Sequence, residues 1–364
     1  MAFPAPSHGR QIRVLIVDDS AFMRRAIERL LAQDPRVTVV GSAADGMEGV
    51  KRALELRPDV ITMDVEMPRM DGVTAVGEIM QSIPTPIVMV STLTSEGTAT
   101  AIRALEAGAV ECIGKPSGLS ADLVNVGEKL IEAVERASVA RVHRQRPVAF
   151  APRPAVPATP PKAPVLTGGR LPAHNVLVIG SSTGGPPALT RVVPRLPGDL
   201  MAAVIVVQHM PAGFTGALAR RLDSLSPLTV AEASEGEPII NGRVYLAPGD
   251  YHLTVTKDKR IHLDQSPALH GVRPSVDLTL FSVAEVFGRA ASVAILTGMG
   301  KDGADGAARL EAAGGQVIAQ DEATCVVYGM PRVTMERARN PIQVPLDEVA
   351  AALVKTLPVS RLAR

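Results

Sequence analysis

A serine stands at the centre of a short glycine-rich run, GSSTGG, at residues 180–185. The run follows the apolar segment NVLVI and has the spacing G-x-S-x-G, in which Ser182 would be the attacking hydroxyl of a nucleophile elbow. Pro186 and Pro187 follow, and proline is favoured in the first turn of a helix. A glycine-rich loop before a helix can also cradle a phosphate. The spacing alone therefore leaves open whether this loop attacks a substrate or holds one.

A serine hydroxyl needs a base to take its proton, and the chain contains seven histidines. His209 directly follows the apolar run AAVIVVQ, which we interpret as a strand that ends at the same sheet edge as the turn of Ser182. The other histidines lie in the N-terminal tail, the segment between domains, the residue before a strand, half-exposed positions of a hairpin, or a loop: His8, His143, His174, His252, His262 and His270. We therefore predict that His209 is the base.

An acid should orient the histidine, and Asp302 is the candidate. It lies in the glycine-rich loop TGMGKDG after the apolar run SVAIL. The carboxyl ends of parallel strands share one edge of a sheet, so three strand ends would bring Ser182, His209 and Asp302 together. The chain order Ser…His…Asp differs from the Ser…Asp…His order of α/β-hydrolases. We therefore interpret G-x-S-x-G as a locally similar turn and not as a sign of that fold.

The loop around Asp302 also matches a different kind of site. A G-x-G-x-x-G pattern follows the strand, and two acids come about 20 residues later, where one would bind a ribose. These residues are Gly298, Gly300, Gly303, Asp321 and Glu322. The pattern lies late in its domain, and it leaves Ser182 and His209 without a role. A nucleotide-binding sensor or dehydrogenase-like domain is therefore the alternative interpretation.

Five residues in the first third of the chain each follow an apolar run: Asp18, Asp19, Asp64, Ser91 and Lys115. In a parallel sheet they would meet at one edge. Three carboxylates there repel each other, and a hard divalent cation such as Mg²⁺ relieves the repulsion. The lysine and the hydroxyl can hold the oxygens of a phosphoryl group, which Asp64 can accept as an acyl phosphate. Each residue alone is more typical of a solvated loop or a helix cap, whereas the five together favour a phosphoryl site.

Short apolar runs alternate with amphipathic stretches before residue 116. The predicted strands are residues 12–17, 37–43, 59–64, 86–91 and 109–114. The predicted helices, with apolar residues at i, i+3 and i+4, are residues 21–33, 47–57, 74–83 and 98–108. Strands that alternate with helices predict a parallel sheet covered on both faces.

The alternation resumes in the second half of the chain. Predicted strands there are residues 176–180, 202–208, 292–298 and 316–320, and residues 232–263, with closer turns, predict an antiparallel hairpin. The predicted fold class is α/β, with two doubly wound parallel-sheet domains. The first is expected to be flavodoxin-like, and the second Rossmann-like with an antiparallel hairpin.

Residues 137–172 separate the two predicted domains, 11–136 and 173–360. From Arg136 to Arg170 the chain has seven Lys or Arg residues and no acid, and much of it is Pro and Ala. Such a run cannot bury enough apolar surface to fold alone, and proline biases it to an extended form. We predict a linker, with a basic segment that binds a partner as the alternative.

Composition limits the classes of function. Of the 364 residues, 46% are hydrophobic but only 2% are aromatic, so aliphatic side chains and methionine must fill the cores. The net charge of +1 argues against binding to nucleic acid, which requires dense positive charge. No apolar run approaches the ~20 residues that span a bilayer, and the N-terminus lacks a signal-peptide core. Two distant cysteines, Cys112 and Cys325, favour a reducing compartment over a disulfide framework. We expect a cytoplasmic protein without membrane insertion.

Residues 11–136 resemble a response-regulator receiver domain of two-component signalling. The motifs VLIVDDS, DVITMDVEMPRMDG, VMVS and GKP occur in the order of that family. The resemblance implies that Asp64 is the phosphoacceptor, Ser91 the switch hydroxyl and Lys115 the contact to the phosphate. The implied ligands of Mg²⁺ are Asp18, Asp19, Asp64 and the backbone carbonyl of Glu66. Cys112 stands where receivers usually carry an aromatic ring, which is a departure from the family pattern.

The chain from His174 onward resembles the catalytic domain of chemotaxis protein-glutamate methylesterases. The matching motifs are IGSSTGGPPAL, VVQHMPAGFTGALARRL, VYLAPGDYHL, RPSVDLTLFS, ILTGMGKDGADG and AQDEATCVVYGMP. The resemblance assigns the nucleophile, the base and the orienting acid to Ser182, His209 and Asp302. The backbone at Thr183 and Met299 is the expected oxyanion hole. Family members often have alanine where this chain has Ser181.

Together the two resemblances imply a phosphorylation-activated hydrolase of chemosensory adaptation. It would demethylate glutamate methyl esters on methyl-accepting chemotaxis receptors and deamidate selected receptor glutamines through the same acyl intermediate. A chemotaxis histidine kinase would be the phosphodonor. Mg²⁺ would serve receiver phosphorylation, and ester hydrolysis would need no cofactor. A non-catalytic scaffold with a vestigial triad is the remaining alternative, but all three triad residues are present.

Overall fold

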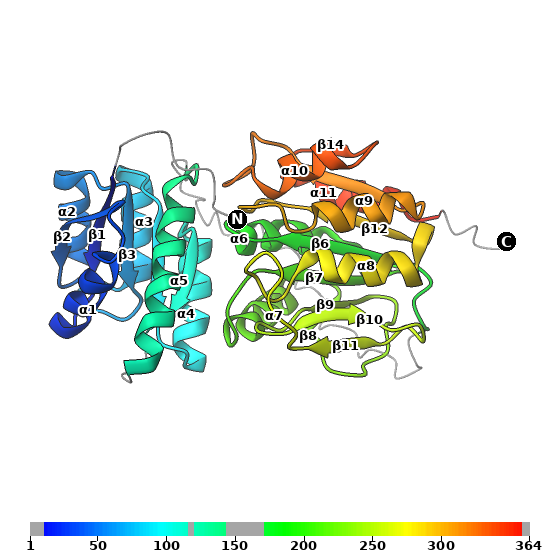
Figure 1. Cartoon of the computed structure of the whole chain (residues 1–364), viewed down its shortest axis with the longest axis horizontal. Helices are drawn as coiled ribbons and strands as arrows, with labels where there is room; N and C mark the ends of the chain where they lie inside the picture. The colour runs from blue at the N-terminus through cyan, green and yellow to red at the C-terminus, as the bar shows by residue number, and fades with distance from the viewer. Residues whose placement is uncertain (1–10, 116–119, 143–170, 359–364) are drawn as a thin grey trace, which may run out of the picture. The chain divides into compact units, whose positions relative to one another are not determined.

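The computed structural model describes residues 11–115, 120–142 and 171–358. The chain divides into two compact units, Met1–Pro147 and Val148–Arg364, and each is described by itself (Figure 1). Within the described residues, no helix is both long enough and apolar enough to cross a lipid bilayer.

The first unit is built on a five-stranded parallel sheet with the order β2-β1-β3-β4-β5. Its strands are β1 (Ile12–Val17), β2 (Val37–Ala43), β3 (Val60–Asp64), β4 (Ile87–Ser91) and β5 (Glu111–Gly114). Its helices are α1 (Ala21–Leu31), α2 (Gly46–Leu56), α3 (Gly72–Ser82), α4 (Ser95–Glu106) and α5 (Ser120–Ser138). This order confirms the flavodoxin-like prediction. The chain reverses direction across the sheet between β1 and β3, and ligands bind at such switch points.

The residues explain why these elements form. Strands β3 and β4 are buried along their whole length, as expected for a parallel sheet with helices on both faces. Helix α1 packs beside α5, whereas α3 packs between α2 and α4. Each of the first four helices starts after a side chain that accepts a hydrogen bond from the first turn. These caps are Ser20, Asp45, Asp71 and Thr94.

The second unit is built on a seven-stranded parallel sheet with the order β14-β13-β12-β6-β7-β9-β8. Its strands are β6 (Val176–Ser181), β7 (Ala203–Gln208), β8 (Thr229–Glu232), β9 (Arg243–Leu246), β12 (Ala291–Ile295), β13 (Gln316–Gln320) and β14 (Ile342–Val344). Its helices are α6 (Gly185–Val192), α7 (Phe214–Leu225), α8 (Val276–Val286), α9 (Ala304–Ala312), α10 (Met330–Arg337) and α11 (Val349–Lys355). The chain starts at β6, builds one side of the sheet and returns to β12, so its switch point lies between β6 and β12.

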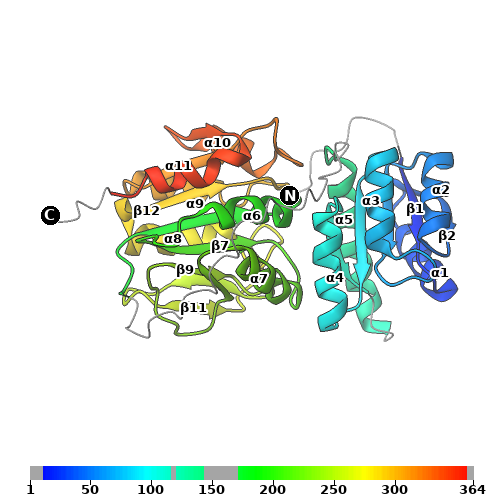
Figure 2. The ribbon, with the colours of Figure 1, turned by 180° about the vertical axis from the view of Figure 1, so that it is seen from behind.

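Helices cover both faces of this second sheet. Helices α8 and α9 lie in front of the sheet in Figure 1. Helices α6, α7 and α11 cover the opposite face, which is turned toward the viewer in Figure 2. The core contains few aromatic rings, and Tyr245 and Phe214 are the largest fully buried side chains of this unit. The α/β fold class predicted from the sequence is confirmed for both units.

The predicted hairpin is confirmed over a shorter stretch. Strands β10 (His252–Val255) and β11 (Ile261–Asp264) form an antiparallel two-stranded sheet. Strands β8 and β9 lie in the same predicted stretch but belong to the parallel sheet, because β9 pairs with β7. Val244, Tyr245 and Leu246 are buried on both sides, which a two-stranded hairpin cannot provide.

Most of the predicted linker lies outside the described residues. Helix α5 continues to Ser138, two residues beyond the expected domain end. At the other end, Pro172 forms an isolated bridge with Ile240 of the second unit. Residues 143–170 between them are outside the described chain, as are His8 and His143. The linker therefore stays a prediction.

Candidate active site and acidic site

Ser182 lies in the tight turn between β6 and α6. Its backbone N–H donates to the carbonyl of Thr297 at 3.0 Å, and its own carbonyl accepts from Gly185 at 2.8 Å. Gly184 caps α6 with a φ of 77°, and a Cβ there would lie 2.6 Å from the side chain of Val326. The turn therefore requires glycine at position 184. The hydrogen bonds of Ser182 with Thr297 and Gly185 hold the serine backbone in place.

His209 follows β7 and reaches the same sheet edge. Its backbone N–H donates to the carbonyl of Ser181 at 3.0 Å, which extends the β6–β7 pairing. Its Nε2 lies 2.7 Å from Asp302 Oδ2, and both side chains are more than nine-tenths buried. Nδ1 is therefore the ring nitrogen left to face the serine. Within the described residues no hydrogen bond joins Ser182 Oγ to His209, and such contacts often tighten only when substrate binds.

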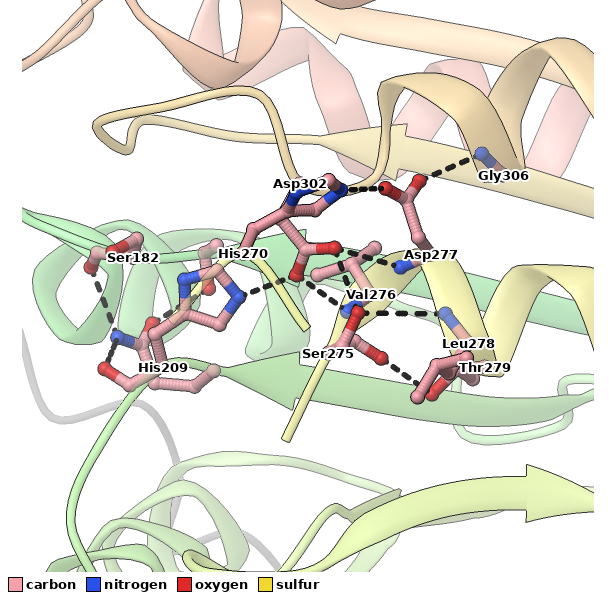
Figure 3. A network of polar contacts seen from close by, with 12 residues as sticks. Ser182, His209, His270, Ser275, Val276, Asp277, Leu278, Thr279, Asp302 and Gly306 are labelled. Atoms are coloured by element: carbon pink, nitrogen blue, oxygen red, sulfur yellow. Dashed lines mark hydrogen bonds and ion pairs between the residues drawn. The ribbon is translucent and has the colours of Figure 1, made fainter. Parts of the chain in front are cut away.

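Asp302 accepts four hydrogen bonds in the loop between β12 and α9 (Figure 3). Its Oδ1 accepts from Ser275 Oγ at 2.8 Å and from the backbone N–H of Asp277 at 3.0 Å. Its Oδ2 accepts from the backbone N–H of Val276 at 2.7 Å, in addition to His209. These contacts fix the carboxylate and leave one oxygen aimed at the imidazole.

The donors to Asp302 also decide its charge. Three of them belong to the N-terminus of α8, which carries partial positive charge. Burial favours the neutral carboxyl, but the hydrogen bond and charge of His209 and the backbone N–H groups of α8 outweigh it. The pKa of Asp302 is therefore lowered to about 2. An ionised acid is what orientation of an imidazolium requires.

Gln208 ties the serine turn to the histidine loop, and we assigned it no role from the sequence. Its Nε2 donates to the carbonyl of Ser182 at 2.9 Å and to that of His209 at 3.0 Å. Its Oε1 accepts from Ser181 Oγ at 2.6 Å, and both side chains are buried. The hydroxyl of Ser181 is thereby used to orient the amide. The buried strand-end position of a lone glutamine is the signal that could have identified it.

Ser275 is a second functional residue that sequence reasoning missed. It caps α8, and its hydroxyl also donates to Asp302. A serine followed by an acid before an apolar run is the pattern of a helix start, so the motif RPSVDLTLFS contained the signal. What the motif cannot show is that the cap faces Asp302, which follows another strand.

The predicted oxyanion residues lie in two loops that touch. Thr183 follows Ser182, and Met299 follows β12 in the glycine-rich loop. A Cβ on Gly298 would lie 2.8 Å from the Cβ of Ser182, so the two loops are in direct contact. The side chain of Thr297 also donates to the carbonyl of Thr183 at 2.9 Å. The oxyanion hole itself stays a prediction.

The glycines of the G-x-G-x-x-G pattern have structural roles in this loop. Gly300 and Gly303 have φ values of 89° and 90°, which favour glycine. A Cβ on Gly303 would lie 2.9 Å from Ile295 and from Val276. Asp321 accepts from the backbone N–H of Thr324 at 3.1 Å and from its hydroxyl, as in a local turn. Close packing around the triad therefore accounts for the pattern that suggested a nucleotide.

One histidine differs from its expected environment. His252 is fully buried in β10 and not half-exposed, and its Nδ1 accepts from the backbone N–H of Ser275 at 3.1 Å. The burial arises because β10 packs against α8. His262 is half-exposed as expected, and His174 is exposed. His270 lies in the expected loop, but its ring approaches a buried carboxylate, Asp277.

Four of the five predicted residues of the acidic site come together at the carboxyl ends of the strands of the first sheet. Ligand atoms of Asp18, Asp19 and Asp64 lie within 4.8 Å of one another. Lys115 Nζ lies 2.6 Å from Asp64 Oδ2 and 3.1 Å from Asp18 Oδ2. Asp18 Oδ2 is buried and has no hydrogen-bond partner within the described residues. A set of carboxylate oxygens, one of which is paired only through the charge of Lys115, fits Mg²⁺.

Charge at this acidic site favours a proton or a cation. Burial raises the pKa of Asp64, and the charge of Asp18 raises it further, whereas the hydrogen bond from Lys115 opposes the rise. Burial opposes protonation of Lys115, but its contacts with Asp64 and Asp18 prevail and raise its pKa. A bound divalent cation would replace the proton and leave Asp64 ionised.

The remaining receiver residues keep their predicted positions. Ser91 ends β4 and donates to the carbonyl of Gly97 at 3.1 Å, so its hydroxyl is engaged with α4. Glu66 is exposed in the loop after β3. Cys112 and Cys325 are both free and buried, and burial raises the pKa of each thiol. Cys112 pairs in register with Met89 of β4, so an apolar contact occupies the usual aromatic position.

Two family models match separate parts of the chain, and related proteins are similar to it along most of its length. Residues 177–353 match the family described as CheB methylesterase, and residues 14–126 match the response regulator receiver domain. A protein-glutamate methylesterase/protein-glutamine glutaminase of Symbiobacterium thermophilum is 49% identical over 96% of this chain and 98% of its own length. A protein of the same name from Thermotoga maritima is 44% identical over 95% of this chain and 98% of its own length. The solved methylesterase catalytic domain of Thermotoga maritima CheB is 46% identical, covers 50% of this chain and 98% of its own, and has a TM-score of 0.48.

Proposed function

Because the chain belongs to the protein-glutamate methylesterase/protein-glutamine glutaminase family, we propose that it hydrolyses glutamate methyl esters on methyl-accepting chemotaxis receptors. By the same proposal it deamidates selected receptor glutamines. The observation that carries the proposal is the contact of 2.7 Å between His209 Nε2 and Asp302 Oδ2 beside the turn that presents Ser182. A binding loop for a phosphate would not need this pair of a histidine and a carboxylate.

The proposed reaction proceeds through an acyl-enzyme. Ser182 Oγ attacks the ester carbonyl carbon while His209 Nδ1 takes its proton, and Asp302 stabilises the imidazolium through Nε2. The imidazolium then protonates the methoxide oxygen, the C–O bond breaks and methanol leaves. Water, deprotonated by His209, attacks the glutamyl ester on Ser182 and releases the carboxylate. With a glutamine side chain, ammonia leaves in place of methanol and the acyl-enzyme is identical.

The oxyanion of each tetrahedral intermediate needs donors that are already in place. We propose the backbone N–H groups of Thr183 and Met299 for this role. The contact between the loops of Ser182 and Gly298 supports the assignment, because it brings both segments to one side of the nucleophile. The partial positive charge at the N-terminus of α6 would add to the stabilisation.

We propose that phosphorylation of Asp64 by the chemotaxis histidine kinase raises the esterase activity. Asp18, Asp19, Asp64 and the carbonyl of Glu66 would hold Mg²⁺, which offsets the charge of the incoming phosphoryl group when it is bound. Lys115 would neutralise a phosphate oxygen, and Ser91 would release Gly97 to contact another. We place both reactions in the cytoplasm, where the two free cysteines would stay reduced.

Replacement of the nucleophile tests the proposal. Ser182→Ala should lower kcat for methanol release from methylated receptors by at least about 10³-fold, because no other hydroxyl occupies the turn position. Ser181→Ala is the matched control, since its hydroxyl orients Gln208 and does not attack. A Ser182→Ala enzyme with wild-type activity would refute the assignment, and so would loss of the acyl-enzyme only in Ser181→Ala.

A further inference from the structure

A second carboxylate lies directly behind the catalytic acid (Figure 3). Asp277 is 1% exposed in the first turn of α8, and its backbone N–H donates to Asp302 Oδ1. Its own Oδ1 accepts from the backbone N–H of Gly306, in the first turn of α9, at 2.7 Å. Its Oδ2 is buried and makes no hydrogen bond to any described residue. A buried carboxylate oxygen without a donor is costly, so its surroundings require an explanation.

His270 is near enough to form an ion pair with this oxygen when its imidazole is protonated. Its Nε2 lies 3.3 Å from Asp277 Oδ2, and its side chain is 26% exposed. The residue has a φ of 55°, a left-handed conformation that few residues other than glycine adopt, and it lies inside the turn closed by Leu269 and Val272. The imidazole is thereby held over the buried oxygen with one side open to solvent. It links the catalytic acid, through Asp277, to the surface.

The charge of Asp277 is sensitive to these neighbours. Burial and then the negative charge of Asp302 raise the pKa of Asp277 to about 6, whereas the amide of Gly306 and the charge of His270 oppose the rise. The titratable groups that face Asp277 are Asp302 and His270. His252 lies in β10, which packs on α8. Its Nδ1 accepts a hydrogen bond from Ser275 and does not face Asp277. Asp277 therefore changes charge near neutral pH in direct contact with the triad.

A metal ion is a poorer explanation for this cluster. Ligand atoms of His270, Asp277 and Asp302 do lie within 4.8 Å of one another. Each oxygen of Asp302 already accepts two hydrogen bonds, however, so a metal would have to displace a donor that orients the acid. The imidazole accounts for the orphaned oxygen without such a loss.

We propose that Asp277 and His270 form a positioning pair for the hydrolysis, in which His270 anchors the Asp277 carboxylate behind Asp302 and the backbone N–H of Asp277 holds Asp302 on His209. This inference rests on the proposed function. The charge on Asp277 also favours the imidazolium that forms when Ser182 attacks, because the added negative charge lies behind Asp302 in a water-poor site. Neither residue touches the substrate. Their effect should appear in kcat and in its pH dependence, and not in KM.

Kinetics of the full chain on methylated receptors test the pair. Asp277→Asn keeps the acceptor for Gly306 but removes the charge, and should lower kcat about tenfold at pH 8, flatten the rise of kcat near pH 6, and leave KM unchanged. His270→Ala should lower kcat by a similar factor, and His270→Gln, which retains a donor, should recover most of it. In the Asp277→Asn background His270→Ala should have little further effect. His262→Ala, which removes an exposed hairpin histidine, is the matched control.

A second readout separates this inference from the proposed function. In ¹⁵N-histidine NMR of the full chain, the ring signals of His270 and His209 should move as Asp277 titrates, and Asp277→Asn should abolish that movement. If wild type released no methanol but the signals moved, the function would fail and the pair would stand. The inference would be wrong if folded variants kept the wild-type kcat and pH profile. It would also be wrong if the ring signals moved equally in wild type and Asp277→Asn.

Discussion

At the scale of single residues, the imidazole of the triad is used in a particular orientation. His209 presents Nε2 to Asp302 at 2.7 Å, which leaves Nδ1 for Ser182. Chymotrypsin-type enzymes use the two nitrogens the other way round. The proposed roles of the residues are unaffected, because either nitrogen can take a proton while the other donates to the acid. The acid must still be ionised, and its four hydrogen bonds ensure that it is.

Asp302→Asn tests whether this orientation matters. The amide cannot accept from every present donor and stabilise an imidazolium, so kcat for methanol release should fall by about 10⁴-fold. KM should change little, since Asp302 does not contact the substrate. Single-turnover kinetics on methylated receptors would measure both. Asp199→Asn, at an exposed carboxyl, is the matched control, and an Asp302→Asn enzyme within a few-fold of wild type would contradict the role.

The raised pKa of Asp277 predicts how stability depends on pH. Between the unfolded value near 3.8 and the folded value of about 6, the folded state binds more protons than the unfolded state. Stability therefore falls as pH rises through this window, by up to about 3 kcal/mol. Asp277→Asn should remove the fall. Urea unfolding at pH 4 and pH 7 measures it, and an equal fall in both proteins would refute the assignment.

At the scale of elements, helix N-termini and strand ends create the active site together. Strands β6, β7 and β12 end at one edge of the sheet and supply the serine, the histidine and the acid. The first turn of α8 donates a backbone hydrogen bond to Asp302, and the first turn of α9 donates one to Asp277. Two buried carboxylates are thereby tolerated side by side, because each faces the positive end of a helix.

Ser275→Ala tests the contribution of the α8 cap. The change removes the cap and one donor to Asp302, so the free energy of unfolding should fall by about 1–2 kcal/mol. The kcat should fall as well, because Asp302 loses one of the bonds that orient it. Chemical denaturation and methanol release measure the two effects. Ser224→Ala, on exposed α7 surface, should stay within about 0.5 kcal/mol of wild type. Equal stability of the two variants would contradict the cap.

At the scale of the whole molecule, the two units place their polar clusters at corresponding points of two parallel sheets. Each has a parallel sheet whose chain reverses direction next to its first strand, and each gathers its reactive groups at that reversal. In the first unit the groups are carboxylates and a lysine, which suit a phosphoryl group. In the second unit they are a serine, a histidine and an acid, which suit an acyl group. Under the proposed function, one chain would combine a phosphoryl-accepting site with an acyl-transferring site.

Asp64→Ala tests the coupling between the two sites. With Mg²⁺ and a small-molecule phosphodonor, the wild type should show raised methanol release, whereas Asp64→Ala should show no stimulation. Its unstimulated activity should match that of the unphosphorylated wild type or exceed it, since the triad is intact. Glu78→Ala, which removes an exposed acid of α3, should respond like wild type. Equal stimulation of wild type and Asp64→Ala would refute regulation through this residue.

The fold class and most of the elements follow from the order and spacing of the residues. Apolar runs of strand length that alternate with amphipathic stretches leave little choice but a covered parallel sheet, and the strand ends then predict which polar side chains meet. Ser182, His209 and Asp302, and likewise Asp18, Asp64 and Lys115, lie where that reasoning placed them. The reason is physical, because the edge at which parallel strands end is set by chain direction alone.

Only the tertiary structure decided what surrounds those residues. The contacts of Gln208, Ser275 and Asp277 with Ser182 and Asp302 join residues 25 or more positions apart, and no local pattern records them. The sequence places His270 in a loop, but only the folded turn brings its ring to the buried Oδ2 of Asp277. Local spacing fixes the direction of a strand or a helix. Burial and the pairing of charges are set by neighbours from the rest of the chain.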